Sequence, residues 1–292
     1  RTDTQIGLLP YILIPVTLDG EIVSYAKQAH ATFYAHDERV GGDAFREKIK
    51  QDEILRYTLA GSMDNLVTPD LVAPYTEEEA SRFEIDYGVL EQYLGFFAGC
   101  EILVADPGAE IDLLAMTGRF DLIREYIAFL RGRFDTVITS VHHAGVTIPL
   151  LETEGIDVDA YLTPVNRLGH YMFPTRELAL DAIRQSRKPV IAIKPLAGGR
   201  DLGTPAFDYV FGLAALDSGR TVDAIFALER VVDAFPDHGP ARAELARAYL
   251  ALGETDDAKI EFEKVKEMGE MPPEARQTIE RYLTGIELFH DR

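Results

Sequence analysis

The chain has 292 residues, enough for one large domain or two ordinary ones, and 47% of them are hydrophobic. Its 49 acidic and 29 basic residues give a formal charge of −20. This charge argues against a nucleic-acid binder and against attachment to anionic lipid, because both are held mainly through Lys and Arg. No apolar run approaches the roughly 18 residues that span a bilayer. The single cysteine, Cys100, excludes an intrachain disulfide, so we expect a reducing, cytoplasmic location.

The first 204 residues alternate short apolar segments with helical patterns. The strand-like segments are residues 11–16, 32–36, 56–60, 102–106, 136–142, 160–165 and 190–194. The helical patterns lie between them, at residues 43–54, 77–97, 119–132 and 175–186. Seven apolar strands in alternation with helices favour a TIM-type (β/α) barrel over an open parallel sheet. An eighth strand is not visible, so the barrel is incomplete, is closed by an earlier segment, or belongs to a fusion.

Chemistry-bearing side chains gather where the predicted strands end, which is where such barrels place their sites. His142 or His143 with Asp106 would form an acid–base pair, and Lys194 would act as a Schiff-base amine or an electrostatic clamp. Adjacent residues on a strand point to opposite faces, so only one of the two histidines would line the mouth. Asn166 would orient a ligand carbonyl or cap a turn. No HxH or HExxH spacing is present, so we expect no metal.

Lys194 also begins the segment KPLAGGR, which ends at residue 200. Gly198 and Gly199 allow adjacent backbone N–H groups to face one ligand, and Arg200 would add a bidentate contact to it. The segment therefore predicts a site for phosphate or another small anion. The alternative is a glycine-rich turn with a solvated arginine.

Residues 137–200, read from VITSVHHAG through VDAYLTPVN to KPVIAIKPLAGGR, resemble the later strands of the aldo/keto reductase barrel. The resemblance implies that Asn166, Lys194 and the following glycines line the mouth of a cofactor or ligand site, and it suggests NADP as the cofactor. The family's catalytic Asp, Tyr, Lys and His are not recognisable on the earlier strands. The resemblance therefore implies the fold but not reductase activity.

A 34-residue repeat organises the C-terminal part. Residues 205–238 align with residues 239–272, and apolar and small residues recur at helical spacing. The aligned pairs are Phe211 and Leu245, Gly212 and Ala246, Ala215 and Tyr249, Gly219 and Gly253, Thr221 and Thr255, Ala224 and Ala258, Leu228 and Phe262, and Val231 and Val265. The small residues predict close approach of two helices, and each glycine of the Gly219 and Gly253 pair predicts a helix end. Residues 274–288 predict a final capping helix.

The segment ELARAYLALGETDDAKIEFEKV, residues 244–265, resembles the tetratricopeptide repeat. In the first copy Pro236 stands where that repeat usually ends in proline, whereas the second copy has Glu270 at the aligned place. We therefore expect a barrel over residues 1–204 and two such repeats plus a cap over residues 205–292. Members of this repeat family commonly bind a protein or peptide in a concave groove. Because residues 205–292 contain 18 acidic and 10 basic residues, a net charge of −8, we expect a basic ligand there.

Three functions follow from these expectations. The first is a barrel that binds a small anionic or nucleotide ligand, joined to a repeat module that recruits a protein. The second is an active barrel enzyme, of lyase, aldolase or oxidoreductase type, that uses Lys194 with His142, His143 and Asp106. The third is an assembly protein in which a degenerate barrel supports the repeats.

Overall fold

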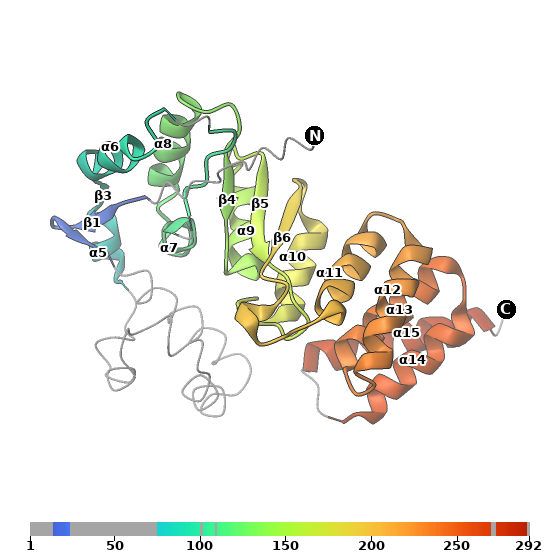
Figure 1. Ribbon diagram of the computed structural model, residues 1–292. Coiled ribbons are helices and arrows are strands. Elements are labelled where there is room, and N and C mark those ends of the chain that lie inside the picture. The colour runs from blue at the N-terminus through green and yellow to red at the C-terminus, as the bar shows by residue number, and fades with distance from the viewer. Residues whose placement is uncertain (1–13, 24–74, 100–101, 109, 270–272, 291–292) are drawn as a thin grey trace, which may run out of the picture. The chain divides into compact units, whose positions relative to one another are not determined.

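The computed structural model describes residues 14–23, 75–99, 102–108, 110–269 and 273–290 (Figure 1). Three predicted elements lie outside these residues, namely the strands at 32–36 and 56–60 and the helix at 43–54. Cys100 lies outside them too. None of the helices within the described ranges is long and apolar enough to cross a membrane.

An antiparallel sheet of three short strands begins the described chain. β1 (Val16–Leu18) pairs with β2 (Glu21–Ile22) on one side and with β3 (Phe83–Ile85) on the other. The turn between β1 and β2 consists of Asp19 and Gly20, with φ angles of 52° and 87°. Positive φ at both residues is what a tight two-residue hairpin turn requires, and Asp-Gly is a favoured pair for it.

The single helix predicted over residues 77–97 is instead two helices separated by β3. Thr76 is the N-cap of α5 (Glu77–Ser81), and Asp86 is the N-cap of α6 (Tyr87–Gly95). Each side chain accepts a hydrogen bond from a backbone N–H in the first turn of its helix, which satisfies a donor that would otherwise lack an intrahelical partner.

Two helices and one isolated bridge precede the second sheet. α7 (Glu110–Met116) and α8 (Phe120–Arg131) contact each other. The segment predicted as a strand at residues 102–106 contributes a single parallel bridge, between Ala105 and Val137.

The second sheet has the order β4-β5-β6 and carries the clearest βαβ pattern of the chain. β4 (Ile138–Ser140) and β5 (Ala160–Pro164) are parallel and are connected by α9 (Ala144–Thr153). β5 is followed by α10 (Arg176–Gln185) and then by β6 (Val190–Ile193), and α10 packs against α9. These three strands fall within predicted strand segments.

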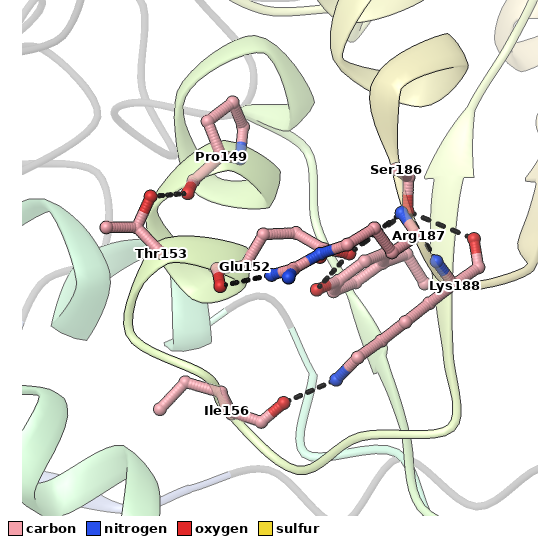
Figure 2. A network of polar contacts seen from close by, with 8 residues as sticks. Pro149, Glu152, Thr153, Ile156, Ser186, Arg187 and Lys188 are labelled. Carbon is pink, nitrogen blue, oxygen red and sulfur yellow. Dashed lines mark hydrogen bonds and ion pairs between the residues drawn. The ribbon is translucent and has the colours of Figure 1, made fainter.

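A polar network joins the end of α9 to the segment between α10 and β6, residues 186–188 (Figure 2). The Glu152 carboxylate accepts hydrogen bonds from Arg187 Nε at 2.5 Å and from Ser186 Oγ at 3.3 Å. Arg187 Nη2 also donates to the Glu152 carbonyl at 2.6 Å, and Lys188 Nζ donates to the Ile156 carbonyl. Burial alone would raise the pKa of Glu152, but the bonds from Arg187 outweigh it and the pKa is lowered.

The prediction of a TIM-type barrel is wrong. Within the described ranges the chain forms eleven α-helices and two three-stranded sheets, and neither sheet closes on itself. The physical reason lies in β1, which pairs antiparallel with both of its neighbours, whereas a TIM barrel is built from parallel strands alone. An apolar segment predicts a strand but not the direction of the strand that pairs with it.

Five helices, drawn orange to red in Figure 1, complete the chain. They are α11 (Thr204–Asp217), α12 (Thr221–Ala234), α13 (Gly239–Leu252), α14 (Thr255–Glu267) and α15 (Pro273–His290). Each helix packs against the next one along the chain.

The chain divides into two compact units. The first contains Arg1–Thr163 and Tyr171–Ile191, and the second contains Pro164–His170 and Ala192–Arg292. The second unit is therefore discontinuous in sequence, because the short segment after β5 belongs with the helical array.

Candidate functional site

The eight residues predicted to share one barrel mouth are divided between the two units. The first unit holds Asp106, His142 and His143, and the second holds Asn166, Lys194, Gly198, Gly199 and Arg200.

Asp106 is completely buried, and its carboxylate is bonded to neighbouring backbone and hydroxyl groups. Oδ1 accepts the N–H groups of Gly108 and Ser140, both at 2.9 Å, and Oδ2 accepts the Ser140 hydroxyl at 2.5 Å. Burial raises the pKa of Asp106 above its ordinary value, although these hydrogen bonds oppose the shift. In this geometry Asp106 fixes the turn after residue 106 to the end of β4.

The aspartate beside the histidines is Asp112 of α7, which the sequence reasoning missed. Its Oδ2 accepts the His142 N–H at 2.7 Å, its Oδ1 accepts the Thr147 hydroxyl at 2.5 Å, and Oδ2 lies 3.8 Å from His143 Nδ1. Burial by itself would raise the pKa of Asp112, but His143, His142 and Thr147 lower it below its ordinary value. The carboxylate thus sits at the N-terminus of α9, where a negative charge is favourable. The signal in the sequence was one acidic residue within the apolar stretch IDLLA.

Glu110 lies in the first turn of α7, close to these two aspartates. Burial raises its pKa to about 7, and the charges of Asp112 and Asp106 act in the same direction. Its Oε2 is buried without a hydrogen-bond partner. Among the described residues, no group of three or more His, Cys, Asp or Glu side chains is arranged to hold a metal ion.

Lys194 directly follows β6 and has a left-handed conformation, with φ of 54°. Its carbonyl accepts the N–H of Ala197 at 2.9 Å, which begins a short 3₁₀ turn, Ala197–Gly199. Burial lowers the pKa of the Lys194 ammonium below its ordinary value, the direction that a Schiff-base amine needs. A catalytic role for Lys194 stays a prediction.

The glycines that follow serve the turn itself. Gly198 and Gly199 have φ angles of 67° and 85°. The N–H groups of Gly199, Arg200 and Asp201 all donate to one acceptor, the carbonyl of Leu196, at 2.9–3.1 Å. These three donors are therefore directed into the turn, and an anion site here stays a prediction.

Asn166 and Arg167 lie in the segment after β5. The Asn166 amide closes a loop, because Nδ2 donates to the His170 carbonyl at 2.8 Å and Oδ1 accepts the His170 N–H at 2.9 Å. The Arg167 guanidinium makes two hydrogen bonds to the Asp201 carboxylate, at 2.8 and 3.0 Å, and both side chains are buried. The guanidinium also lies 3.7 Å from the centre of the Phe235 ring.

His238 connects this segment to the helical array. Its Nδ1 accepts the N–H of Ala241 at 3.0 Å as the N-cap of α13, and its Nε2 lies 2.9 Å from the Arg167 carbonyl. With Nδ1 accepting, Nε2 carries the proton and donates it, so the ring is neutral in this arrangement.

The helical array has the packing that its repeat predicted. A Cβ atom on Gly212 of α11 would lie 2.7 Å from Leu228 Cγ of α12, so these helices approach as closely as glycine allows. Gly253 ends α13 in the left-handed conformation, with φ of 95°. A separate apolar cluster joins Ala246 of α13 to α14 and α15.

One side of α13 is left uncovered by these contacts. Leu245 is 3% exposed, and Tyr249, one turn further along, is hydrogen-bonded to Glu229 of α12 at 2.8 Å. Ala243 and Leu250 pack against the cluster with α14 and α15. Between these two sides α13 carries the partly exposed Arg247 and, one turn further, the exposed Ala251.

The family model described as the tetratricopeptide repeat matches residues 215–282, from the end of α11 into α15. This match confirms the repeat expectation for that part of the chain. Nothing supports the resemblance of residues 137–200 to the aldo/keto reductase barrel. No curated protein and no solved structure matches the chain. Arrays of such repeats are a protein-interaction module, since stacked helix pairs create extended binding surfaces.

Proposed function

We propose that the protein recruits a partner through its tetratricopeptide repeats and that the recruited segment is basic and extended. The observation that carries this proposal is the match of residues 215–282 to the repeat family, together with the stacked helices α11–α15. The basic character follows from the 18 acidic and 10 basic residues of this part, because a net charge of −8 attracts cations and repels anions.

The uncovered side of α13 is the surface to which we assign this binding. Neighbouring helices bury its other sides, which leaves Arg247 and Ala251 accessible from solvent. Arg247 is neutralised within its own helix by an ion pair to Glu244 at 2.5 Å. A basic segment therefore meets no uncompensated positive charge there.

The test uses the full chain and two labelled, unstructured peptides of equal length, one rich in lysine and glycine and the other rich in glutamate and glycine. We expect the lysine-rich peptide to bind and the glutamate-rich peptide not to bind, and we expect the affinity of the lysine-rich peptide to fall as salt is added. Ala251→Arg places a positive charge on the uncovered side of α13 and should weaken binding about fivefold or more. Ile260→Arg on α14 adds the same charge elsewhere and is the matched control.

Equal losses in both variants would mean that net charge alone attracts the peptide, and they would reject the assigned surface. Failure of the lysine peptide to bind at low salt would reject the basic partner itself.

A further inference from the structure

The two repeats differ on one face of their first helices. On α13, Ala241, Leu245 and Ala248 lie on one side at spacings of four and three residues and are 0%, 3% and 0% exposed. Their counterparts 34 positions earlier, on α11, are Phe207, Phe211 and Ala214. Phe207 is 40% exposed, Phe211 is 64% exposed and Ala214 is exposed as well. We call this side of α11, defined by Phe207, Phe211 and Ala214, the open face.

The reason for the difference is visible within the array. α12 packs against α13, and the Glu229 carboxylate of α12 accepts a hydrogen bond from Tyr249, one turn beyond Leu245. A helix therefore covers the face of α13 that corresponds to the open face. On α11 the two phenylalanines leave roughly 200 Å² of aromatic surface in solvent. The chain itself thus shows which kind of element fits this face, an amphipathic helix.

Charge decides which helix fits. Residues 205–238 contain six acidic and two basic residues, a net charge of −4. Both basic residues are already paired with aspartates, Arg220 with Asp223 and Arg230 with Asp208. A second copy of this chain would bring another charge of −4 against the same surface, so like charges oppose self-association. A helix with lysines or arginines beside its apolar stripe meets complementary charge.

We propose that the open face docks a basic amphipathic helix of another protein, seated on α11 as α12 is seated on α13. The apolar stripe of that helix covers Phe207 and Phe211, and its basic side chains are attracted by the net charge of −4 of residues 205–238. This contact is distinct from the side of α13 that carries Arg247 and Ala251.

The probe is a synthetic helix derived from α12. It has the sequence of residues 221–234 with Asp223→Lys, Glu229→Lys and Asp233→Lys, and a companion peptide keeps the original acids. We expect fluorescence anisotropy with the full chain to show binding of the lysine peptide and about tenfold weaker binding of the companion. Phe211→Asp should weaken binding of the lysine peptide about tenfold or more. Ile260→Asp, an equally drastic change at another exposed apolar residue, should leave it within about twofold.

Ala214→Arg provides a second variant on the open face, in case Phe211→Asp lowers the thermal midpoint of the full chain. Ala251→Arg should leave binding of the lysine helix unchanged, which separates this proposal from the proposed function above. Equal effects of Phe211→Asp and Ile260→Asp, or no binding of the lysine helix, would overturn the proposal. So would a dimer of the wild-type protein in sedimentation that Phe211→Asp abolishes, because a second copy would then occupy the open face.

Discussion

The Cα of Gly212 faces Leu228 so closely that a Cβ atom would lie 2.7 Å from Leu228 Cγ and 3.0 Å from its Cδ2. Leu228 is completely buried. The α11–α12 contact therefore requires glycine at this position, whereas the second repeat has Ala246 at the aligned place.

Gly212→Ala should therefore destabilise the protein by about 1–3 kcal/mol, because overpacking outweighs the better helix propensity of alanine. Gly285→Ala in α15 is the matched control, since nothing lies within 4 Å of a Cβ atom there. The control should gain about 0.5–1 kcal/mol. Urea unfolding measures both, and equal effects of the two substitutions would show that the contact with Leu228 is easily relaxed.

The ion pair between Arg167 and Asp201 is buried, with side-chain exposures of 10% and 2%. Asp201→Ala should cost about 3–5 kcal/mol, because it leaves the Arg167 guanidinium buried without its carboxylate. Asp223→Ala removes the partner of Arg220 in an exposed pair and should cost no more than about 1 kcal/mol. If calorimetric unfolding showed comparable losses of stability for Asp201→Ala and Asp223→Ala, burial would not explain the cost of breaking the Arg167–Asp201 pair.

Glu110 should make stability fall as the pH rises. Its pKa is about 7 in the folded chain, against an ordinary value of 4.5. Between these values the folded protein keeps a proton that the unfolded chain releases, so stability declines from pH 4.5 to about pH 7 and then levels off. Glu110→Gln should be more stable than the wild type at about pH 8, on the order of 1–3 kcal/mol, but not at about pH 5.

Glu84→Gln, on the exposed side of β3, removes the same charge at a solvated position and serves as the control for Glu110. If it reproduces the pH dependence of Glu110→Gln, the effect belongs to net charge and not to the burial of Glu110.

Glu152 should make stability fall as the pH is lowered, which is the opposite of the effect expected for Glu110. Because Arg187 lowers its pKa, the carboxylate stabilises the fold above the ordinary pKa of glutamate, and that contribution is lost as the pH falls through the lowered value. Glu152→Gln should cost about 1–2 kcal/mol at neutral pH and progressively less in acid, as followed by thermal unfolding. A loss that is constant with pH would assign the effect to packing.

The helical array could be predicted because its signal is repeated. Residues such as Gly212, Gly253 and Leu245 each belong to an aligned pair, and a period of 34 residues fixes which helices neighbour each other. The part of the chain before α11, which contains the βαβ pattern, has no repeated signal of this kind. Apolar runs predict the strands at residues 138–140, 160–164 and 190–193, and the first two of these strands are buried along their whole length, as such runs indicate.

The direction of strand pairing could not be predicted in the same way. Apolar runs carry no information about it, and the local signal for an antiparallel hairpin is the Asp19-Gly20 pair. The candidate site had a similar limit. The predicted strand ends single out His142, His143 and Asp106, but the contact of Asp112 with His142 joins residues 30 positions apart. Contacts of this kind depend on how the helices pack together, and this packing cannot be deduced from the spacing of residues along the chain.

The segment Pro164–His170 belongs to the same compact unit as the helices from residue 204 onward. An expression fragment that starts just before α11 would therefore lack Arg167, which lies over Phe235 and whose carbonyl bonds His238. A fragment defined by one boundary just before α11 would therefore lack part of the compact unit to which the repeats belong. A minimal repeat fragment needs either the chain from residue 164 onward or a linker that reconnects residues 164–170 to residue 192.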